Sequence, residues 1–167
     1  MTDYHFDQPE HLTVGAIGEV GARLFVLQAR QGRQLVTVKV EKIQVSTLAT
    51  YLARVVKAMG RPGHLPEVPA LEFEAGLEID FIVGDVNVAL DEDQDRVVVL
   101  LEELVRDDDL EPSRLLCSLT KEQAGAFAIA ATRLIEAGRP PCPLCALPLD
   151  PRGHDCPRTN GFRAPIT

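Results

Sequence analysis

Tryptophan is absent from this chain of 167 residues, and the other large aromatic side chains are limited to six Phe and two Tyr. A core built on aromatic packing is therefore excluded, and we expect an aliphatic core. Hydrophobic residues make up 46% and charged residues 25% of the chain, which is the balance of an ordinary folded domain. A chain of this length can fold alone, burying roughly 70% of its unfolded surface.

Long apolar runs are also missing. The longest wholly apolar stretches, such as residues 124–131 (AGAFAIAA), are too short to span a bilayer. Residues 1–14 are acidic and contain no apolar segment, so we expect no signal peptide, no membrane association and a cytoplasmic location. Thiols stay reduced in the cytoplasm, where closely spaced cysteines favour metal or redox chemistry over structural disulfides.

Cations are in deficit, with 17 Lys and Arg against 25 Asp and Glu and a net charge of −8 at pH 7. Binding to a phosphate backbone requires clustered cations, so this balance argues against a general nucleic-acid-binding protein. The sequence fits a protein that repels itself mildly and stays dispersed.

Residues 12–59 predict three strands and a helix. Alternating apolar and polar residues predict strands over 12–17, 22–30 and 34–40, with a turn at QGR between the last two. From residue 41 to 59 the period becomes helical, and the apolar stripe consists of Val45, Leu48, Leu52, Val55, Val56 and Met59.

The second half of the chain repeats this order. Strands are expected over 77–90, 96–104 and 114–119, after which Thr120 and Gln123 form a capping-box signature for a second helix. The apolar stripe of this helix consists of Ala124, Phe127, Ala131, Leu134 and Ile135.

A possible duplication follows from aligning the two helices. A shift of 79 positions superimposes the stripes and places identical residues at Lys42 and Lys121, Gln44 and Gln123, Ala49 and Ala128, Arg54 and Arg133, and Ala58 and Ala137. Helical periodicity alone would supply some of these identities. We predict an α+β body over residues 1–138, with βββα units at 12–59 and 77–138 and a linker at 60–72. Because hairpin links are too short for parallel crossovers, we expect an antiparallel sheet covered by the two helices.

The last part of the chain, residues 139–167, is rich in proline and has no apolar periodicity. Such a segment cannot bury enough apolar area to offset the entropy lost on ordering. It carries the pattern Cys142-x2-Cys145, eight further residues, then His154-x-Cys156. Zn²⁺ takes four such ligands at tetrahedral positions and contributes on the order of 10 kcal/mol to folding. We therefore predict a small zinc knuckle with Cys142, Cys145, His154 and Cys156 as the metal ligands.

Four protein ligands would close the site to water and substrate, which makes the zinc structural. A catalytic zinc would require water in place of one of these ligands. The other readings of the cysteines are a redox Cys-x-x-Cys pair, a disulfide that leaves the third cysteine over, and an unstructured tail. Cys117, on an apolar strand, is interpreted as a small buried hydrophobic residue.

Three aspartates, Asp91, Asp93 and Asp95, begin like a calcium-binding loop. Arg96 occupies the position where such loops need glycine, so an exposed hairpin turn is the preferred interpretation. Ser and His residues show no nucleophile motif, and no glycine-rich phosphate loop opens a helix. No catalytic or cofactor-binding residues are therefore predicted.

The tail is the basic part of the chain, with Arg139, Arg152, Arg158 and Arg163 near Phe162. Arginines around a zinc knuckle can bind RNA or an acidic partner, or form salt bridges with the acidic body of the same protein. The last of these is favoured here.

The segments DEDQDRVVV (91–99), AGRPPCPLCALPLDPRGHDCPRTNGFR (137–163) and GxxGxxxxxLQAR (18–30) resemble a largely actinobacterial family known only as a domain of unknown function. Members of that family are similar along nearly the whole chain and end in Cys-Pro-x-Cys-Gly-Leu-Pro-Leu-Asp-Pro. This sequence has Ala146 where glycine is usual, a change that leaves the ligands untouched and stiffens the knuckle. The resemblance implies no assigned activity. It implies genes encoded near a phosphoglycerate-mutase-like and a phosphoinositide-kinase-like protein, and so a shared pathway.

Together these features predict a non-catalytic, zinc-stapled adaptor that binds a protein partner. One alternative is a phosphate-ester or nucleotide hydrolase, or its accessory subunit, with Mg²⁺ on the three aspartates. Another is RNA binding through the tail. The identity of the partner and the oligomeric state stay open.

Overall fold

The computed structural model describes residues 1–19, 21–71, 78–107, 110–138, 142–147, 149 and 156–158. In chain order its elements are β1 (Asp3–Phe6), β2 (His11–Ile17), β3 (Leu24–Gln31), β4 (Gln34–Val40), α1 (Lys42–Ala58), β5 (Phe81–Asp91), β6 (Arg96–Glu103), β7 (Arg114–Leu119) and α2 (Lys121–Glu136). The expected strands and helices all occur close to their predicted positions. Among the described strands, only β1 was not predicted.

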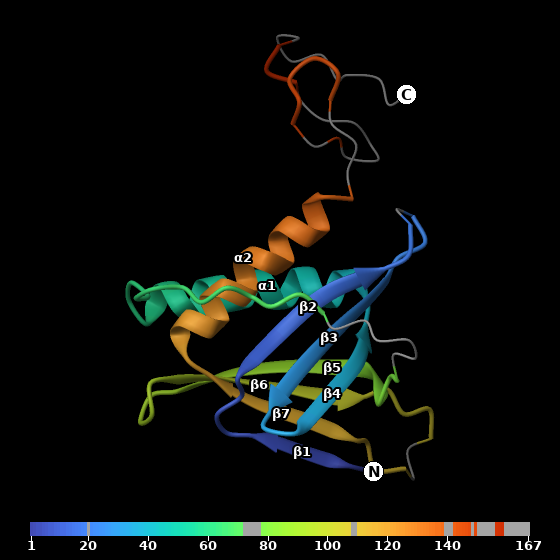
Figure 1. The fold of residues 1–167 in the computed structure, drawn as a ribbon, viewed down its shortest axis with the longest axis vertical. Helices are drawn as coiled ribbons and strands as arrows, with labels where there is room; N and C mark the ends of the chain where they lie inside the picture. Colours follow the sequence, from blue (N-terminus) through green and yellow to red (C-terminus); the bar gives the residue numbers. More distant parts are fainter. Residues whose placement is uncertain are drawn as a thin grey trace.

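The strands form a single sheet in the order β1-β7-β6-β5-β4-β3-β2 (Figure 1). Pairing is antiparallel within β2–β3–β4 and within β5–β6–β7, but β4 pairs parallel with β5 and β1 pairs parallel with β7. The sheet is therefore mixed, and the prediction of an antiparallel sheet was wrong. Hairpin links exclude parallel pairing only inside each half, whereas α1 supplies the long crossover that lets β5 lie parallel to β4.

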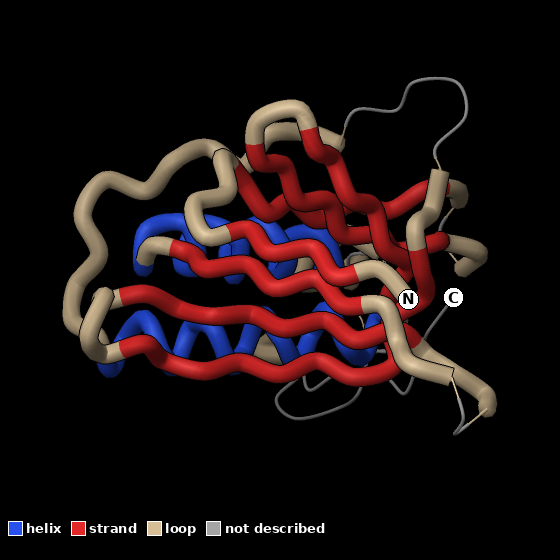
Figure 2. The backbone as a smooth tube through the Cα atoms, turned by 90° about the horizontal axis from the view of Figure 1, so that it is seen from below, coloured by secondary structure: helices blue, strands red, loops and turns tan. Residues whose placement is uncertain are grey.

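Both helices cover one face of the sheet, which gives a two-layer α+β structure (Figure 2). α1 contacts β5, α2 contacts β2, and the helices contact each other. The buried residues of α1 are Val45, Leu48, Ala49, Leu52 and Val56, so the predicted stripe faces the core. The predicted capping box of α2 is confirmed, since Gln123 N–H donates to Thr120 Oγ1 at 3.1 Å and Thr120 N–H donates to Gln123 Oε1 at 3.0 Å.

The parallel contact between β4 and β5 extends over only two residue pairs. Asp80, just before β5, reinforces it: its backbone N–H donates to Thr37 O, and Thr37 N–H donates to Asp80 Oδ2, both at 2.8 Å. The hydroxyl of Tyr4 donates to Asp80 Oδ1 at 3.2 Å. A single carboxylate thus joins β1, β4 and the start of β5.

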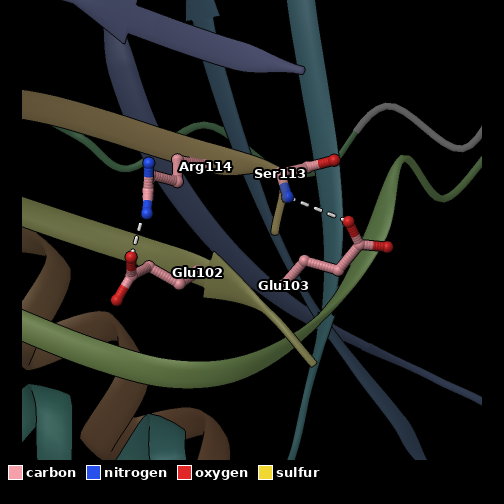
Figure 3. A network of polar contacts seen from close by, with 4 residues as sticks. All are labelled: Glu102, Glu103, Ser113 and Arg114. Carbon is pink, nitrogen blue, oxygen red and sulfur yellow. Dashed lines mark hydrogen bonds and ion pairs between the residues drawn. The ribbon is translucent and has the colours of Figure 1, made fainter. Parts of the chain in front are cut away.

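β1 is held at the sheet edge by polar contacts with residues next to β7. Thr2 N–H donates to Ser113 Oγ at 3.2 Å, and Arg114 N–H donates to Thr2 O at 2.9 Å. In the network shown in Figure 3, Ser113 N–H donates to the Glu103 carboxylate at 2.9 Å, and Arg114 Nε donates to Glu102 at 2.8 Å. The hydrogen bonds from Ser113 lower the pKa of Glu103 from its ordinary value of 4.5.

Residues 60–71 form neither helix nor strand and cross the outside of α2 and β2 (Figure 1). Near its start, Gly63 N–H donates to Glu122 on α2 at 3.1 Å. At its end, Leu71 is buried against Gly15 of β2, where an added Cβ would lie 1.9 Å from Leu71 Cδ1. A larger residue at position 15 would therefore force the Leu71 side chain to shift. None of the helices described has the length and apolarity needed to cross a membrane.

Replacing Phe6 with alanine tests whether β1 belongs to the cooperative fold. Phe6 has an exposed fraction of 0%, so Phe6→Ala is expected to lower the free energy of unfolding by about 3–5 kcal/mol, as cavities in cores do. Urea unfolding followed by circular dichroism measures the loss. Tyr51→Ala is the control, because Tyr51 is 48% exposed and should lose less than about 1 kcal/mol. Equal small losses would show that β1 is detached from the fold.

A double substitution tests the contact between Leu71 and Gly15. Gly15→Ala is expected to destabilise the protein by about 1–3 kcal/mol, because the new methyl group overlaps the Leu71 side chain. Adding Leu71→Ala should recover part of that loss, which gives a favourable coupling energy between the two substitutions. Strictly additive losses would mean that residue 71 does not pack on β2.

Candidate metal centre

The candidate site follows the end of α2, where residues 142–147 form a tight turn. Cys142 N–H donates to Leu147 O at 2.8 Å, and Ala146 N–H donates to Cys142 O at 2.9 Å. These two bonds close the turn and place Cys142 and Cys145 on it together. Figure 1 shows the segment beyond the C-terminal end of α2, apart from the sheet.

The sulfurs of Cys142, Cys145 and Cys156 all lie within 4.8 Å of one another. The Sγ atoms of Cys142 and Cys156 are 3.9 Å apart, and none of the three cysteines is in a disulfide. Two sulfurs bound to one zinc at about 2.3 Å with a tetrahedral angle are separated by about 3.8 Å. The spacing of the sulfurs therefore fits metal ligation, and the three cysteines can hold a metal ion.

Neighbouring backbone and thiol groups affect how readily these cysteines lose a proton. Leu144 N–H points at Cys142 Sγ at 3.5 Å, a contact that stabilises a thiolate and fixes its orientation. Burial raises the pKa of the Cys145 thiol; a backbone hydrogen bond from Leu147 opposes this, and the neighbouring Cys156 and Cys142 thiols raise the pKa further. A bound cation would act in the opposite direction, because a coordinated thiol is deprotonated.

The cysteines lie in a small buried cluster of their own, separate from the main core. Cys142, Leu149 and Cys156 are 2%, 3% and 1% exposed, and Cys145 packs against them. Among the tail residues that the structure describes, Leu149 is the only aliphatic member of the cluster, and burying one leucine contributes about 1.5–3 kcal/mol. Ordering the backbone costs roughly 1–2 kcal/mol per residue, so apolar burial alone cannot hold the segment together. Leu149 was not predicted as part of the site, although it is an apolar residue in a proline-rich tail.

Ala146 has φ of 61°, in the left-handed region that glycine adopts without strain. The turn therefore has the backbone geometry that explains the glycine at this position in the resembling family. In this chain the alanine carries strain of about 1 kcal/mol, which opposes closure of the turn.

His154, the predicted fourth ligand, lies outside the described residues, as do Arg139, Arg152, Phe162 and Arg163 of the predicted basic tail. Arg158 is described and exposed. The structure therefore brings together the three cysteines of the predicted set.

Cys117 is buried in β7 and does not join the cluster, which confirms its interpretation as a small buried residue. Burial raises the pKa of its thiol to about 12, so it stays protonated and unreactive.

The aspartates of the β5–β6 hairpin also stay apart. Gln94 N–H donates to Asp91 Oδ1 at 3.1 Å, and the side chains of Asp93 and Asp95 are exposed, as in an ordinary turn. Across the described residues, the three cysteines form the only group with metal-ligand spacing. The Mg²⁺ site that the hydrolase alternative requires is therefore not assembled on this hairpin.

A protein family described as a protein of unknown function (DUF3090) matches residues 4–156 of the chain. The match extends from β1 to the last cysteine of the cluster. Neither the search of curated proteins nor the search of solved structures found a match.

Relief of the backbone strain at Ala146 is testable. Ala146→Gly is expected to raise the affinity for Zn²⁺ about two- to five-fold, because about 1 kcal/mol of strain is removed and part is offset by the entropy of glycine. Competition with a chromophoric chelator measures the change. Ala137→Gly serves as the control, since Ala137 has an ordinary φ of −60°. An unchanged affinity for both variants would mean that closure of the turn is not coupled to the metal.

Proposed function

The chain belongs to the DUF3090 family of proteins of unknown function, and we propose that it is a non-catalytic adaptor whose C-terminal segment is folded around one structural Zn²⁺. The ligands of the zinc are Cys142, Cys145, His154 and Cys156. The observation that carries the proposal is the convergence of the sulfurs of Cys142, Cys145 and Cys156, of which the first and last are buried and Cys145 is partly buried, in a cluster that has Leu149 as its one other member among the described residues.

Zinc is favoured over other cations by the chemistry of the donors. Thiolates are soft ligands, and a set of three thiolates and one imidazole is a common structural zinc site. Ca²⁺ and Mg²⁺ prefer oxygen ligands, which the described cluster lacks. His154 is supported as the fourth ligand by its position two residues before Cys156.

A closed four-ligand site leaves no position for water or substrate, so the zinc organises the chain and does not take part in catalysis. We divide the chain into an α+β body (1–138) and the zinc-binding tail (139–167), with the tail presented to a protein partner from the end of α2. None of the four cysteines is in a disulfide, which supports a reducing, cytoplasmic location. Nucleic acid is the less favoured partner because of the net charge of −8.

We also propose that the body arose from two βββα units, residues 12–59 and 77–138. Each helix begins with a capping box whose third residue is glutamine. Each glutamine also reaches the other half: Gln44 Nε2 donates to two carbonyl oxygens of β5 at 3.2 and 2.9 Å, and Gln123 Nε2 donates to Pro9 O, close before β2, at 2.9 Å. This reciprocal contact supports a common origin of the halves.

Removal of single ligands tests the zinc site. Native mass spectrometry of the purified protein should find one zinc per chain, lost on treatment with a chelator. Cys156→Ser and His154→Gln are each expected to weaken zinc binding at least ten-fold, whereas Cys117→Ala should leave the stoichiometry at one. Full zinc retention by Cys156→Ser would refute the site, and retention by His154→Gln alone would remove the histidine from it.

The thermal stability of the body shows whether the zinc stabilises only the tail or the whole protein. Because the cysteine cluster is separate from the main core, chelation should leave the thermal midpoint of the body within about 2 °C of the zinc-bound value. The tail should at the same time become sensitive to limited proteolysis. A body that unfolds on chelation would show that the zinc supports the whole fold.

The absence of catalysis is tested on the zinc-bound protein. A screen of phosphate esters and nucleotides in the presence of Mg²⁺ should show no turnover above the buffer. Robust hydrolysis that is lost on substitution of body residues would overturn the adaptor proposal and favour the hydrolase alternative.

A further inference from the structure

The strand β5 extends well beyond its neighbour on one side. β4 and β5 run parallel, and the last residues that pair between them are Lys39 and Ile82. β4 ends at Val40, whereas β5 continues to Asp91, and in Figure 1 this continuation runs to the hairpin at the left of the body. Residues 85–90 therefore pair with β6 on one side and with no described strand on the other.

The unpaired side of residues 85–90, the β5 edge, presents backbone groups that can bind a further strand. In an antiparallel pair, alternate residues direct their N–H and C=O groups away from the partner strand. Just before the edge, α1 takes up two of these groups, because Gln44 Nε2 donates to Val83 O at 3.2 Å and to Gly84 O at 2.9 Å. From residue 85 onward, no described backbone group bonds to this side of the strand. The β5 edge therefore offers the donors and acceptors that strand addition uses.

The side chains of the β5 edge do not block such pairing. Proteins protect a free edge with lysine, proline, inward-pointing charges or a bulge. Residues 86–90 are Val, Asn, Val, Ala and Leu, without charge or proline, and the register irregularity of β5 lies before them, between Val83 and Asp85. An unprotected edge of this kind is a template for pairing with another chain.

An open, mostly apolar cleft of about 450 Å³ lies beside the edge, between α1 and β5. Ile43 of α1 and Val86 and Val88 of β5 contribute to its lining. The two valines are half-buried, and Ile43 is 71% exposed although it is large and apolar. A strand added to the edge would place apolar side chains against these residues and remove Ile43 from water.

A second copy of β5 fits this edge. When two copies pair antiparallel about Asn87, residues that lie opposite each other share a face of the sheet. Val86 of one copy then lies opposite Val88 of the other on the face that carries the main core, and Asp85 lies opposite Ala89 on the other face. Asn87 lies opposite Asn87, and its amide can both donate and accept. No acid lies opposite an acid in this register, although each copy carries a net charge of −8.

We propose that the chain forms a two-fold symmetric dimer in which the β5 edges of two copies pair antiparallel about Asn87. A register centred on Val88 is disfavoured, because it would place Asp85 opposite Asp91 of the other copy. In a two-fold contact the same surface serves both copies, so the association stops at the dimer. The dimer uses neither the cysteines nor the tail, so failure of the zinc proposal would leave it intact.

Sedimentation velocity of the zinc-bound protein over a concentration series tests the dimer. The wild-type protein is expected to show a reversible equilibrium between monomer and dimer. Asn87→Lys and Asn87→Asp should each weaken dimerisation by about ten-fold or more, because like charges then face each other across the axis. Asn87 is exposed, so neither substitution disturbs the core. An equimolar mixture of the two variants should recover the dimer, since lysine then faces aspartate.

A matched control and a second variant complete the test. Gln34→Lys makes the same change from a neutral side chain to lysine at an exposed position of β4 away from the β5 edge, and it should change the dissociation constant by less than about two-fold. Ile43→Ser should weaken the dimer by about five-fold or more, because it removes the apolar side chain that the second copy covers.

Three results would overturn the proposal. The first is a wild-type protein that stays monomeric at every concentration, which would leave the cleft for an extended segment of another protein. The second is a dimer that tolerates both Asn87 variants or is weakened as much by Gln34→Lys. The third is a mixture of the Asn87 variants that associates no better than either variant alone, since this would show that the two residues do not face each other.

Discussion

The parallel contact between β4 and β5 is the constraint on which the rest of the fold depends. Without it the chain would consist of a three-stranded sheet (β2–β4) and a four-stranded sheet (β5–β7 with β1), each with one helix, and neither could cover its own core. Because only two residue pairs join the strands directly, the side chain of Asp80 and the packing of α1 on β5 have to supply what the ladder lacks. α1 packs on β5 of the second half of the chain, and α2 packs on β2 of the first half, so each half contributes a helix to the core of the other. The main core, which includes residues of both halves of the sheet, follows from this joint.

The local elements could be predicted because each carries its own periodicity. The stripe from Val45 to Val56 and the Thr120–Gln123 capping box reproduce the observed helices, and the alternation around QGR reproduces the β3–β4 hairpin. β1 could not be predicted, because a strand of four residues is too short to show an alternating pattern. Its position also depends on pairing with β7, which is more than 100 residues away in the chain. The parallel pairing of β4 with β5 was missed for a similar reason. It depends on where α1 places the chain that follows it, and no short stretch of the sequence determines this.

More of the candidate metal site than of the strand pairing could be predicted, because the spacing of ligands within a short segment is a local pattern. The spacing of Cys142, Cys145 and Cys156 led to three sulfurs in mutual reach. The left-handed backbone at Ala146 was not predicted, and it could not be derived from alanine, which disfavours this conformation.

The position of β1 has a consequence for the order in which the protein can assemble during its synthesis. Thr2 bonds to Ser113, which follows it by 111 residues, and the strand pairs with β7. β1 therefore has no partner strand to dock on until β7 has been synthesised. Phe6, which pairs with Cys117 and is fully buried in the fold, cannot reach its native position during that interval, so β1 becomes native only after β7 is in place.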